Sequence, residues 1–285
     1  VRVYNAVGQL WLFGVKTTEV WYNSGASDFP FQRINGAKIQ VGCAAAHSVV
    51  GLDNSVFWLG ADAKGKGIVY KANGFIPERI STHTIEYALQ QVTDLSTCRA
   101  YSYQQDGHVF YVLTGAGMAT TLVYDVSSGQ WHERAYLNSS GMFETHLAST
   151  CMYAFGKVLV GDRTSGIVYD MSLSYFSDNG SALKAQRTFT HLSNSGEPMR
   201  LTSLEVDFEA GVGLTTGQGS DPVCTLEISE DGGKTWSPEY TASIGAIGKY
   251  LSRAVWRRLG YAFQFTFRIS ITDPVKRSIC GAYLK

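Results

Sequence analysis

The sequence predicts an all-β fold in which a β-propeller-like repeat domain is followed by a β-sandwich. Three observations lead to this prediction. A short strand pattern recurs four times in the first 180 residues, each copy has a tight-turn signal, and one long strand near the C-terminus alternates apolar and polar residues. A repeat array of this kind favours a scaffold or binding platform over an enzyme.

The repeated pattern is a short strand that ends in tyrosine. The four tyrosines are 48, 54 and 45 residues apart, and periods of about 40–55 residues built from short strands and turns are typical of propeller blades. We expect them at equivalent positions in consecutive blades; they are Tyr22, Tyr70, Tyr124 and Tyr169. A second apolar run precedes each copy, and turn signals lie just upstream of that run at Gly8, Asp53-Asn54, Asp106-Gly107 and Gly156.

The second and third repeats each predict a four-stranded antiparallel meander. In the second repeat the strands are Ala46–Asp53, Ser55–Ala61, a run that ends at Tyr70, and Phe75–Ile80. In the third they are Arg99–Gln105, His108–Leu113, Thr121–Val126 and Trp131–Ala135. The first repeat ends in Phe29–Ile34, and the fourth begins near His146 and is less regular after Tyr169. Between the second and third repeats, His83–Val92 has the spacing of a short helix.

The pattern changes near residue 198. We therefore predict a propeller-like domain of four blades over residues 1–180, a linker over 181–198 that is rich in Ser, Asn and Gly, and a β-sandwich over 199–285. The run Phe263–Ile271 alternates over nine residues, which predicts a strand with one apolar and one wet face. A hairpin is expected from Thr225–Ser229 to Lys234–Ser237.

The composition limits the classes of partner and site. The 24 basic and 24 acidic residues balance, so there is no general attraction to nucleic acid or membrane, although a local basic patch stays open. Five widely spaced cysteines indicate reduced, mostly buried thiols. No apolar run approaches the ~20 residues of a membrane span. The chain starts as if a strand were already in progress, so we expect a processed or truncated chain.

No pattern of catalytic, cofactor-binding or metal-ligating residues is apparent. The six histidines form no pair with zinc-ligand spacing. Gly115-Ala116-Gly117 lies between two strands and does not open a helix, which argues against nucleotide binding. We therefore predict no catalytic residues, no cofactor and no metal.

The most specific short motif resembles the Asp box of sialidases and other propeller proteins. Its residues are Ser229, Asp231, Gly233, Thr235 and Trp236. The carboxylate can accept hydrogen bonds from backbone amides of a turn, a glycine supplies a positive φ, and the tryptophan packs under the loop. We interpret the motif as structural, because a sialidase would also need an arginine cluster, a Tyr–Glu pair and repeated boxes.

A basic cluster near the C-terminus has two interpretations. Trp256, Arg257 and Arg258 are either a solvated strand edge or an interface, since Arg and Trp are favoured anchors of subunit contacts. A surface that faces DNA is included in the second interpretation.

Several segments together resemble the packaged-DNA stabilisation proteins of short-tailed bacteriophages, also called tail hub, plug or head-closure proteins. The segments are Phe31–Ile34, Gly51–Gly60, Tyr70–Phe75, Arg79–His83, Tyr103–His108, Tyr124–Val126, Trp131–Arg134 and Trp256–Gly260, with the single Asp box. The resemblance spans nearly the whole chain. Members of that family are longer at the N-terminus, which fits the abrupt start.

The resemblance implies a non-enzymatic structural protein of the virion tail, assembled in the host cytoplasm. It implies a ring of identical copies, expected to be a hexamer, that contacts the portal or its adaptor and the tail needle, fibre or spike. Packaged DNA would be held nearby without sequence-specific binding, and no membrane is involved. The alternative is a sialidase-like glycan-active or receptor-binding propeller, for which a concave site with three arginines, a tyrosine and a carboxylate would be the sign.

Overall fold

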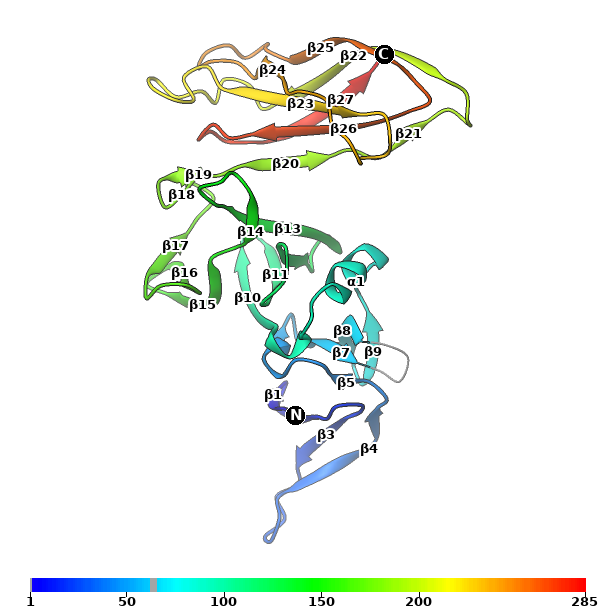
Figure 1. Ribbon diagram of the computed structural model, residues 1–285. Helices are drawn as coiled ribbons and strands as arrows, with labels where there is room; N and C mark the ends of the chain where they lie inside the picture. The colour runs from blue at the N-terminus through cyan, green and yellow to red at the C-terminus, as the bar shows by residue number, and fades with distance from the viewer. Residues whose placement is uncertain (1, 62–65) are drawn as a thin grey trace. The chain divides into compact units, whose positions relative to one another are not determined.

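The computed structural model describes residues 2–61 and 66–285 (Figure 1). The chain divides into two units, residues 1–172 and 173–285. Both are built almost entirely from antiparallel strands, which confirms the predicted all-β class. Within the described ranges no helix is long and apolar enough to cross a membrane.

The first unit consists of four sheets in chain order, here called blades 1 to 4. Blade 1 contains β1 (Arg2–Ala6), β2 (Gln9–Phe13), β3 (Thr18–Asn23) and β4 (Phe31–Ile39). Blade 2 contains β5 (Gly42–Cys43), β6 (Val50–Leu52), β7 (Ser55–Ala61), β8 (Lys66–Asn73) and β9 (Ile76–Arg79). Blade 3 contains β10 (Arg99–Gln105), β11 (His108–Thr114), β12 (Thr121–Asp125), β13 (Gln130–Leu137) and β14 (Phe143–Thr145). Blade 4 contains β15 (Ala148–Ala154), β16 (Lys157–Asp162) and β17 (Val168–Met171).

The first hairpin of every blade closes with a two-residue turn in which both residues have positive φ. These pairs are Val7-Gly8, Asp53-Asn54, Asp106-Gly107 and Phe155-Gly156. Two positive φ angles define the turn whose twist matches paired strands, and Asp, Asn and Gly adopt it most readily. The turn chemistry therefore fixes where each blade folds back, as the sequence predicts. Val7 and Phe155 are exceptions, because a β-branched and a bulky side chain, which are 59% and 93% exposed, hold φ at 52° and 56°.

The repeated tyrosines occupy equivalent positions in three blades. Tyr70, Tyr124 and Tyr169 each face the fourth residue of the preceding strand, at Trp58, Tyr111 and Val160. In blade 1 the corresponding residue is Glu19, opposite Leu12, so the prediction for Tyr22 is wrong. A register shift between β3 and β4 accompanies this difference, and Tyr22 lies three residues further along the strand.

The first strand of the second repeat is shorter than predicted. Residues Ala46–Ser48 form a 3-10 turn, and only Val50–Leu52 joins the sheet. The Ser48 hydroxyl donates to the carbonyl of Ala45 at 2.7 Å and accepts from the amide of Leu59 at 2.9 Å. A buried side chain thus takes the place of a strand in hydrogen bonding to β7.

The apolar core of the first unit is a series of clusters between consecutive blades. Blades 1 and 2 share one that includes Phe13 and Trp58. Blades 2 and 3 share another, in which Phe57 stacks on Tyr111. Blades 3 and 4 share a third, which includes Tyr103, Val123, Val158 and Val160. Each blade therefore packs on the next one in the chain, as in propeller and solenoid repeats.

The end blades each have a second face outside these clusters. On blade 4 the register places Met152, Leu159 and Val168 on this face, and Met152 and Val168 are 62% and 64% exposed. On blade 1 the corresponding face carries Val3, Leu10, Leu12 and Trp21, of which Val3 is exposed. Both outer faces are therefore partly apolar.

The predicted helix between blades 2 and 3 is confirmed as α1 (His83–Gln90). Thr82 caps its N-terminus by accepting from the amide of Ile85. Glu86 is buried and accepts hydrogen bonds from Arg79 and from the hydroxyl of Ser81. Although burial favours its neutral form, these donors hold the pKa of Glu86 below its ordinary value. The helix joins the cluster between blades 2 and 3 through Ile85 and Leu89.

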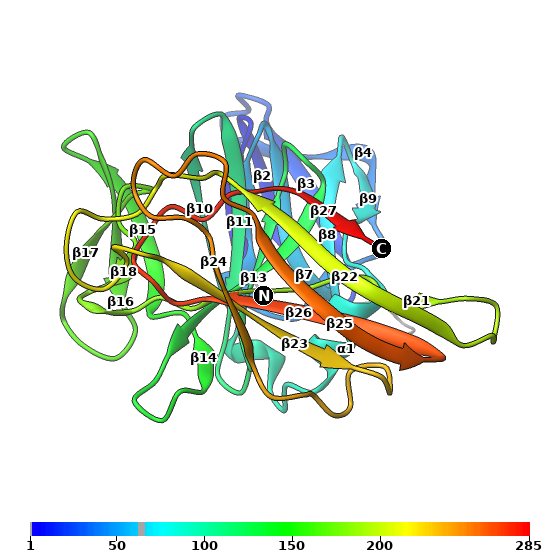
Figure 2. The ribbon, with the colours of Figure 1, turned by 90° about the horizontal axis from the view of Figure 1, so that it is seen from above.

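The second unit is a sandwich of two antiparallel sheets around one apolar core (Figures 1 and 2). One sheet contains β20 (Ala185–Thr188), β21 (Leu192–Ser193), β23 (Val223–Ser229), β24 (Tyr240–Ser243) and β26 (Gln264–Ile271). The other contains β22 (Met199–Phe208), β25 (Ala254–Ala262) and β27 (Ile279–Leu284). A small hairpin, β18 (Ser177–Asp178) and β19 (Ser181–Ala182), precedes them. Leu204, Val206 and Phe208 on β22 are buried, as their alternation predicts.

Three local predictions for this unit are corrected. The expected linker over 181–198 contains β20 and β21, which both pair with β26. The expected strand Lys234–Ser237 is a loop, and β23 pairs instead with Tyr240–Ser243. The face of β26 that was expected to be wet is largely covered, with Thr266 and Ser270 buried, because strands flank β26 on both edges and the loop after β23 lies over Arg268.

Candidate functional site

The Asp-box residues form a closed hydrogen-bonded loop between β23 and β24. Asp231 accepts from the amides of Lys234 and Thr235, both at 2.9 Å, and from the hydroxyls of Ser229 and Thr235 at 2.8 and 2.6 Å. The Ser229 hydroxyl also accepts from the amide of Gly233, whose φ is 91°. These bonds, the one from the Thr235 hydroxyl foremost, hold the pKa of Asp231 well below its ordinary value. Donors of the loop itself therefore occupy the carboxylate.

Trp236 contacts the sheet through the side chain of Arg268. The Arg268 guanidinium lies 3.9 Å from the centre of the Trp236 ring and makes two hydrogen bonds to Glu227, at 2.7 and 2.6 Å. The motif thus joins a turn to the outer face of β23 and β26. Such a cation–π contact is stronger when the cation is partly desolvated than at an exposed site. The interpretation of the Asp box as structural agrees with these contacts and stays a prediction.

The structure separates the members of the predicted interface cluster. Trp256 is only 6% exposed, belongs to the sandwich core, and donates from Nε1 to the carbonyl of Tyr240 at 2.8 Å. It points inward because Ala254 and Trp256 alternate on the core side of β25, so the prediction of Trp256 as a surface anchor is corrected. Arg257 and Arg258 are exposed, and neither side chain has a hydrogen-bond or ion-pair partner in the part of the chain that the structure describes.

Arg258 lies at an irregularity of the sandwich. The pairing of β22 with β25 shifts register between Leu201 and Ser203, and Arg258 takes a left-handed φ of 62°. Such a bulge redirects a side chain and costs conformational energy in a residue that is not glycine. Arg258 and Arg200 line the same hollow, of about 450 Å³, together with Tyr261. The strand irregularity thus brings two exposed cations to one place.

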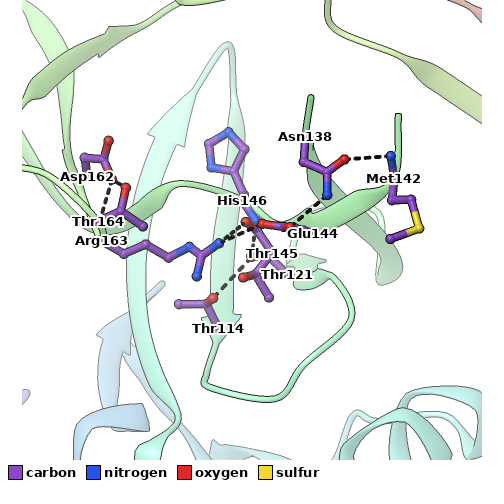
Figure 3. A network of polar contacts seen from close by, with 10 residues as sticks. All are labelled: Thr114, Thr121, Asn138, Met142, Glu144, Thr145, His146, Asp162, Arg163 and Thr164. Carbon is purple, nitrogen blue, oxygen red and sulfur yellow. Dashed lines mark hydrogen bonds and ion pairs between the residues drawn. The ribbon is translucent and has the colours of Figure 1, made fainter. Parts of the chain in front are cut away.

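A polar cleft lies between blades 3 and 4 of the first unit, with a volume of about 550 Å³. We call it the blade 3–4 cleft. Its polar lining comes from strand ends and loops of both blades and from the segment before β10, at Thr97, Arg99, Thr114, Thr145, Ser149, Asp162 and Arg163. Around it a hydrogen-bonded network joins the two blades (Figure 3). No local motif in the sequence marks these residues, so they were not predicted as a site.

The network fixes the walls of the cleft. The Arg163 guanidinium donates to the carbonyl of Thr145 at 3.1 Å and lies 3.8 Å from the carboxylate of Glu144. On the blade 3 side, the Thr121 hydroxyl donates to that of Thr114 at 3.2 Å and accepts from the amide of His146 at 3.1 Å (Figure 3). Both blades therefore contribute fixed polar groups.

Asp162 lines the cleft, but its carboxylate is hydrogen-bonded within its own turn. Its carboxylate accepts from the amide and hydroxyl of Thr164 at 2.7 and 2.8 Å, from the Ser165 hydroxyl at 2.9 Å and from the Tyr169 hydroxyl at 3.2 Å. The amide of Thr164 is the main cause that holds the pKa of Asp162 well below its ordinary value. The cleft thus contains two arginines, a tyrosine-bound carboxylate and several hydroxyls. It falls short of the three arginines expected of a sialidase-type site.

The histidines and cysteines form no metal centre among the residues that the structure describes. His108 contacts Asp125 at 2.8 Å, and burial, followed by the Arg134 charge, lowers the pKa of His132 to about 4. All five cysteines are free, and burial raises the pKa of Cys98 to about 11 and of Cys224 to about 12. The Cys98 and Cys224 thiols are therefore protonated and unreactive near neutral pH.

Comparison with known families gives two adjacent matches. Residues 1–175 match the family model described as "Bacteriophage P22 Gp10, beta-propeller", and residues 184–285 match the model described as "Bacteriophage P22 Gp10, beta-sandwich". The predicted fold, a propeller-like domain followed by a sandwich, is thereby confirmed. A comparison with curated proteins gives no match.

Two solved structures are distantly similar to this chain. A protein described as "Glycoside hydrolase" is 13% identical, with a TM-score of 0.23, and the match covers 99% of this chain and 69% of that one. A glycoside hydrolase family 43 arabinoxylan arabinofuranohydrolase from Bacillus subtilis, in complex with cellotetraose, is 11% identical, with a TM-score of 0.21, and the match covers 99% and 78%. TM-scores this low support no conclusion about chemistry.

Proposed function

Because the chain belongs to the bacteriophage P22 Gp10 family, we propose that it is a tail hub or head-closure protein that stabilises the packaged DNA of a phage. Membership of a family of phage structural proteins is the observation that carries this proposal. In it, the protein is assembled in the host cytoplasm, works in the virion tail, and connects the portal or its adaptor to the needle, fibre or spike.

The proposed assembly is a closed ring of identical copies, with a hexamer as the expected order. A ring requires head-to-tail contacts between two different surfaces of each subunit. Exposed apolar side chains on the outer faces of blades 1 and 4 support a protein that works inside an assembly. Arg257 and Arg258, which have no side-chain partner among the described residues, supply a second surface, of the residue type that is enriched at interfaces.

The proposed mechanism of DNA retention is geometric. The 24 basic and 24 acidic residues cancel, so the chain lacks the net positive charge that drives general binding to phosphates. Retention would come from the closed ring and the surface it buries, which should exceed about 1,000 Å² at each stable interface. No sequence-specific contact with DNA is part of this proposal.

The proposal includes no catalytic step. A general acid or base needs a titratable group with a pKa near the working pH and within reach of a substrate. Asp162 and Asp231, the carboxylates of the two most ordered polar loops, accept hydrogen bonds from their own turns, and their pKa values are lowered. These groups stabilise loops and are poorly suited to proton transfer.

Depletion of the protein from an infection tests the function. Heads that lack it should fill with DNA and then lose it, which the DNA content of purified particles and the infectious titre would measure. Stable, filled and infectious particles without the protein would refute the proposal. Cryo-electron microscopy of complete tails would give the ring order and the neighbours of each unit.

A substitution at the strand irregularity tests the interface. Arg258→Gly removes a cation but suits the left-handed backbone, so folding should be retained. We expect fewer subunits per particle, measured by quantitative mass spectrometry of purified virions. Arg187→Gln, at another exposed arginine of the same unit, is the control. Equal incorporation of the two variants would exclude Arg258 from the interface.

A further inference from the structure

The blade 3–4 cleft presents more hydrogen-bond donors than it satisfies. Arg99 begins β10 and lines the cleft, yet its guanidinium has no hydrogen-bond or ion-pair partner among the described residues. Arg163 is held by the carbonyl of Thr145 and lies 3.8 Å from Glu144. One of the two cations is thus left without an internal counter-ion.

Two threonine hydroxyls add polar groups to the cleft beside these arginines. Thr145 is 6% exposed and lines the cleft, and its hydroxyl has no partner within the described ranges. Thr114, also 6% exposed, is hydrogen-bonded to the hydroxyl of Thr121 at 3.2 Å and lines the same cleft. The Thr145 hydroxyl is not one of the described buried side-chain atoms that lack a partner, so it is open to the cleft and can donate to an acceptor of a ligand.

The acceptors in the cleft are already engaged. Asp162 receives four hydrogen bonds from Thr164, Ser165 and Tyr169. Glu144, which is not part of the lining but lies near Arg163, accepts from Asn138 at 2.9 Å. A ligand would therefore meet free donors and occupied acceptors, which suits an oxyanion.

The size and lining of the cleft define the rest of the ligand. A volume of about 550 Å³ is larger than a single ion needs and lies in the range of small-molecule sites. The lining consists of arginine, aspartate, hydroxyl-bearing and small residues, without a large apolar side chain. We propose that the blade 3–4 cleft binds a small hydroxylated oxyanion, in which a phosphate or carboxylate meets Arg99 and the threonine hydroxyls. This goes beyond the proposed structural role.

Calorimetric titration of the full chain tests the site with four probes: glucose 6-phosphate, glucuronate, inorganic phosphate and neutral glucose. We expect saturable binding of at least one sugar anion, weaker binding of phosphate alone and none of glucose. Arg99→Gln should weaken binding about tenfold or more, because a hydrogen bond to a charged group is lost. Thr145→Val should weaken it several-fold, and Arg187→Gln, an exposed arginine of the other unit, should leave it unchanged.

The outcomes separate the two sources of charge. Preference for glucose 6-phosphate assigns the site to phosphates, and preference for glucuronate assigns it to carboxylates; either supports the proposal. Equal affinity for glucose, unchanged affinity in Arg99→Gln, or no saturable binding of any anion up to about 10 mM would overturn it. Thermal unfolding of each variant verifies that the fold is retained, which the exposed position of Arg99 favours.

Discussion

Two tyrosines of blade 3 should respond in opposite directions to the same chemical change. Tyr111 is fully buried and donates to the carbonyl of Ser48 in blade 2 at 2.9 Å. Tyr101 is 6% exposed, and its buried hydroxyl has no hydrogen-bond partner among the described residues. Replacement by phenylalanine removes one oxygen from each and leaves both rings in place.

The contacts set the sign and size of each effect. Tyr111→Phe loses a neutral hydrogen bond and leaves the Ser48 carbonyl without a partner, so the free energy of unfolding should fall by about 1–2 kcal/mol. Tyr101→Phe removes a buried hydroxyl that loses its hydrogen bonds to water on folding and makes none with the described residues. That variant should therefore be about 1 kcal/mol more stable than the parent chain.

Differential scanning calorimetry, with urea unfolding as a second measure, can resolve the difference. A change of 1 kcal/mol moves the melting temperature by about 2–4 °C in a domain of this size. The two variants should lie on opposite sides of the parent protein. A loss of stability in Tyr101→Phe equal to that in Tyr111→Phe would refute the accounting of hydrogen bonds between the blades.

Three other changes give distinct expected results. Gly42→Ala places a methyl group 2.2 Å from the carbonyl oxygen of Val15, so the free energy of unfolding should fall by about 1–3 kcal/mol and the melting temperature with it. Gly166→Ala adds a methyl group in open space and should be neutral. Glu86→Gln should make the free energy of unfolding less dependent on pH on the acid side. The pKa of Glu86 is lowered on folding, so its contribution to stability is present above pH 4.5 and is lost as the pH falls through the pKa of the folded state. A urea midpoint that changes with pH in the variant as it does in the parent chain would contradict this. Asp231→Asn should lower the melting temperature of the second unit without changing virion incorporation, since one acceptor oxygen becomes a donor that faces amides; selective loss of incorporation would show a binding role instead.

The parts of the fold that could be predicted are those fixed by neighbouring residues. The first strand of blade 3, Arg99–Gln105, has its predicted bounds, because the Asp106-Gly107 turn ends it and starts the next strand. The helix after blade 2 could be predicted for the same reason, because the spacing of apolar residues within its own segment indicates it. Strand β20 was missed because its polar sequence resembles a loop and its partner, β26, lies about 80 residues further along the chain.

The candidate sites were harder to predict from the sequence, for a related reason. Arginines flank Trp256 in the sequence, yet its pairing with Leu204 turns it into the core. The cleft residues Arg99, Thr145 and Arg163 come from the ends of strands in two blades, and none stands in a recognisable motif. The packing of one blade on the next brings them together, so a single sequence does not reveal their proximity.

The succession of cores in the first unit has a consequence for how it opens. Blades 2 and 3 each contribute to two clusters, whereas blades 1 and 4 each contribute to one. In an array coupled only between nearest neighbours, the terminal members fray first, and the middle exchanges its amide hydrogens most slowly. A neighbour that docks on an end blade would suppress this fraying without touching the centre, so incorporation into a particle would raise amide protection most at the two ends of the row.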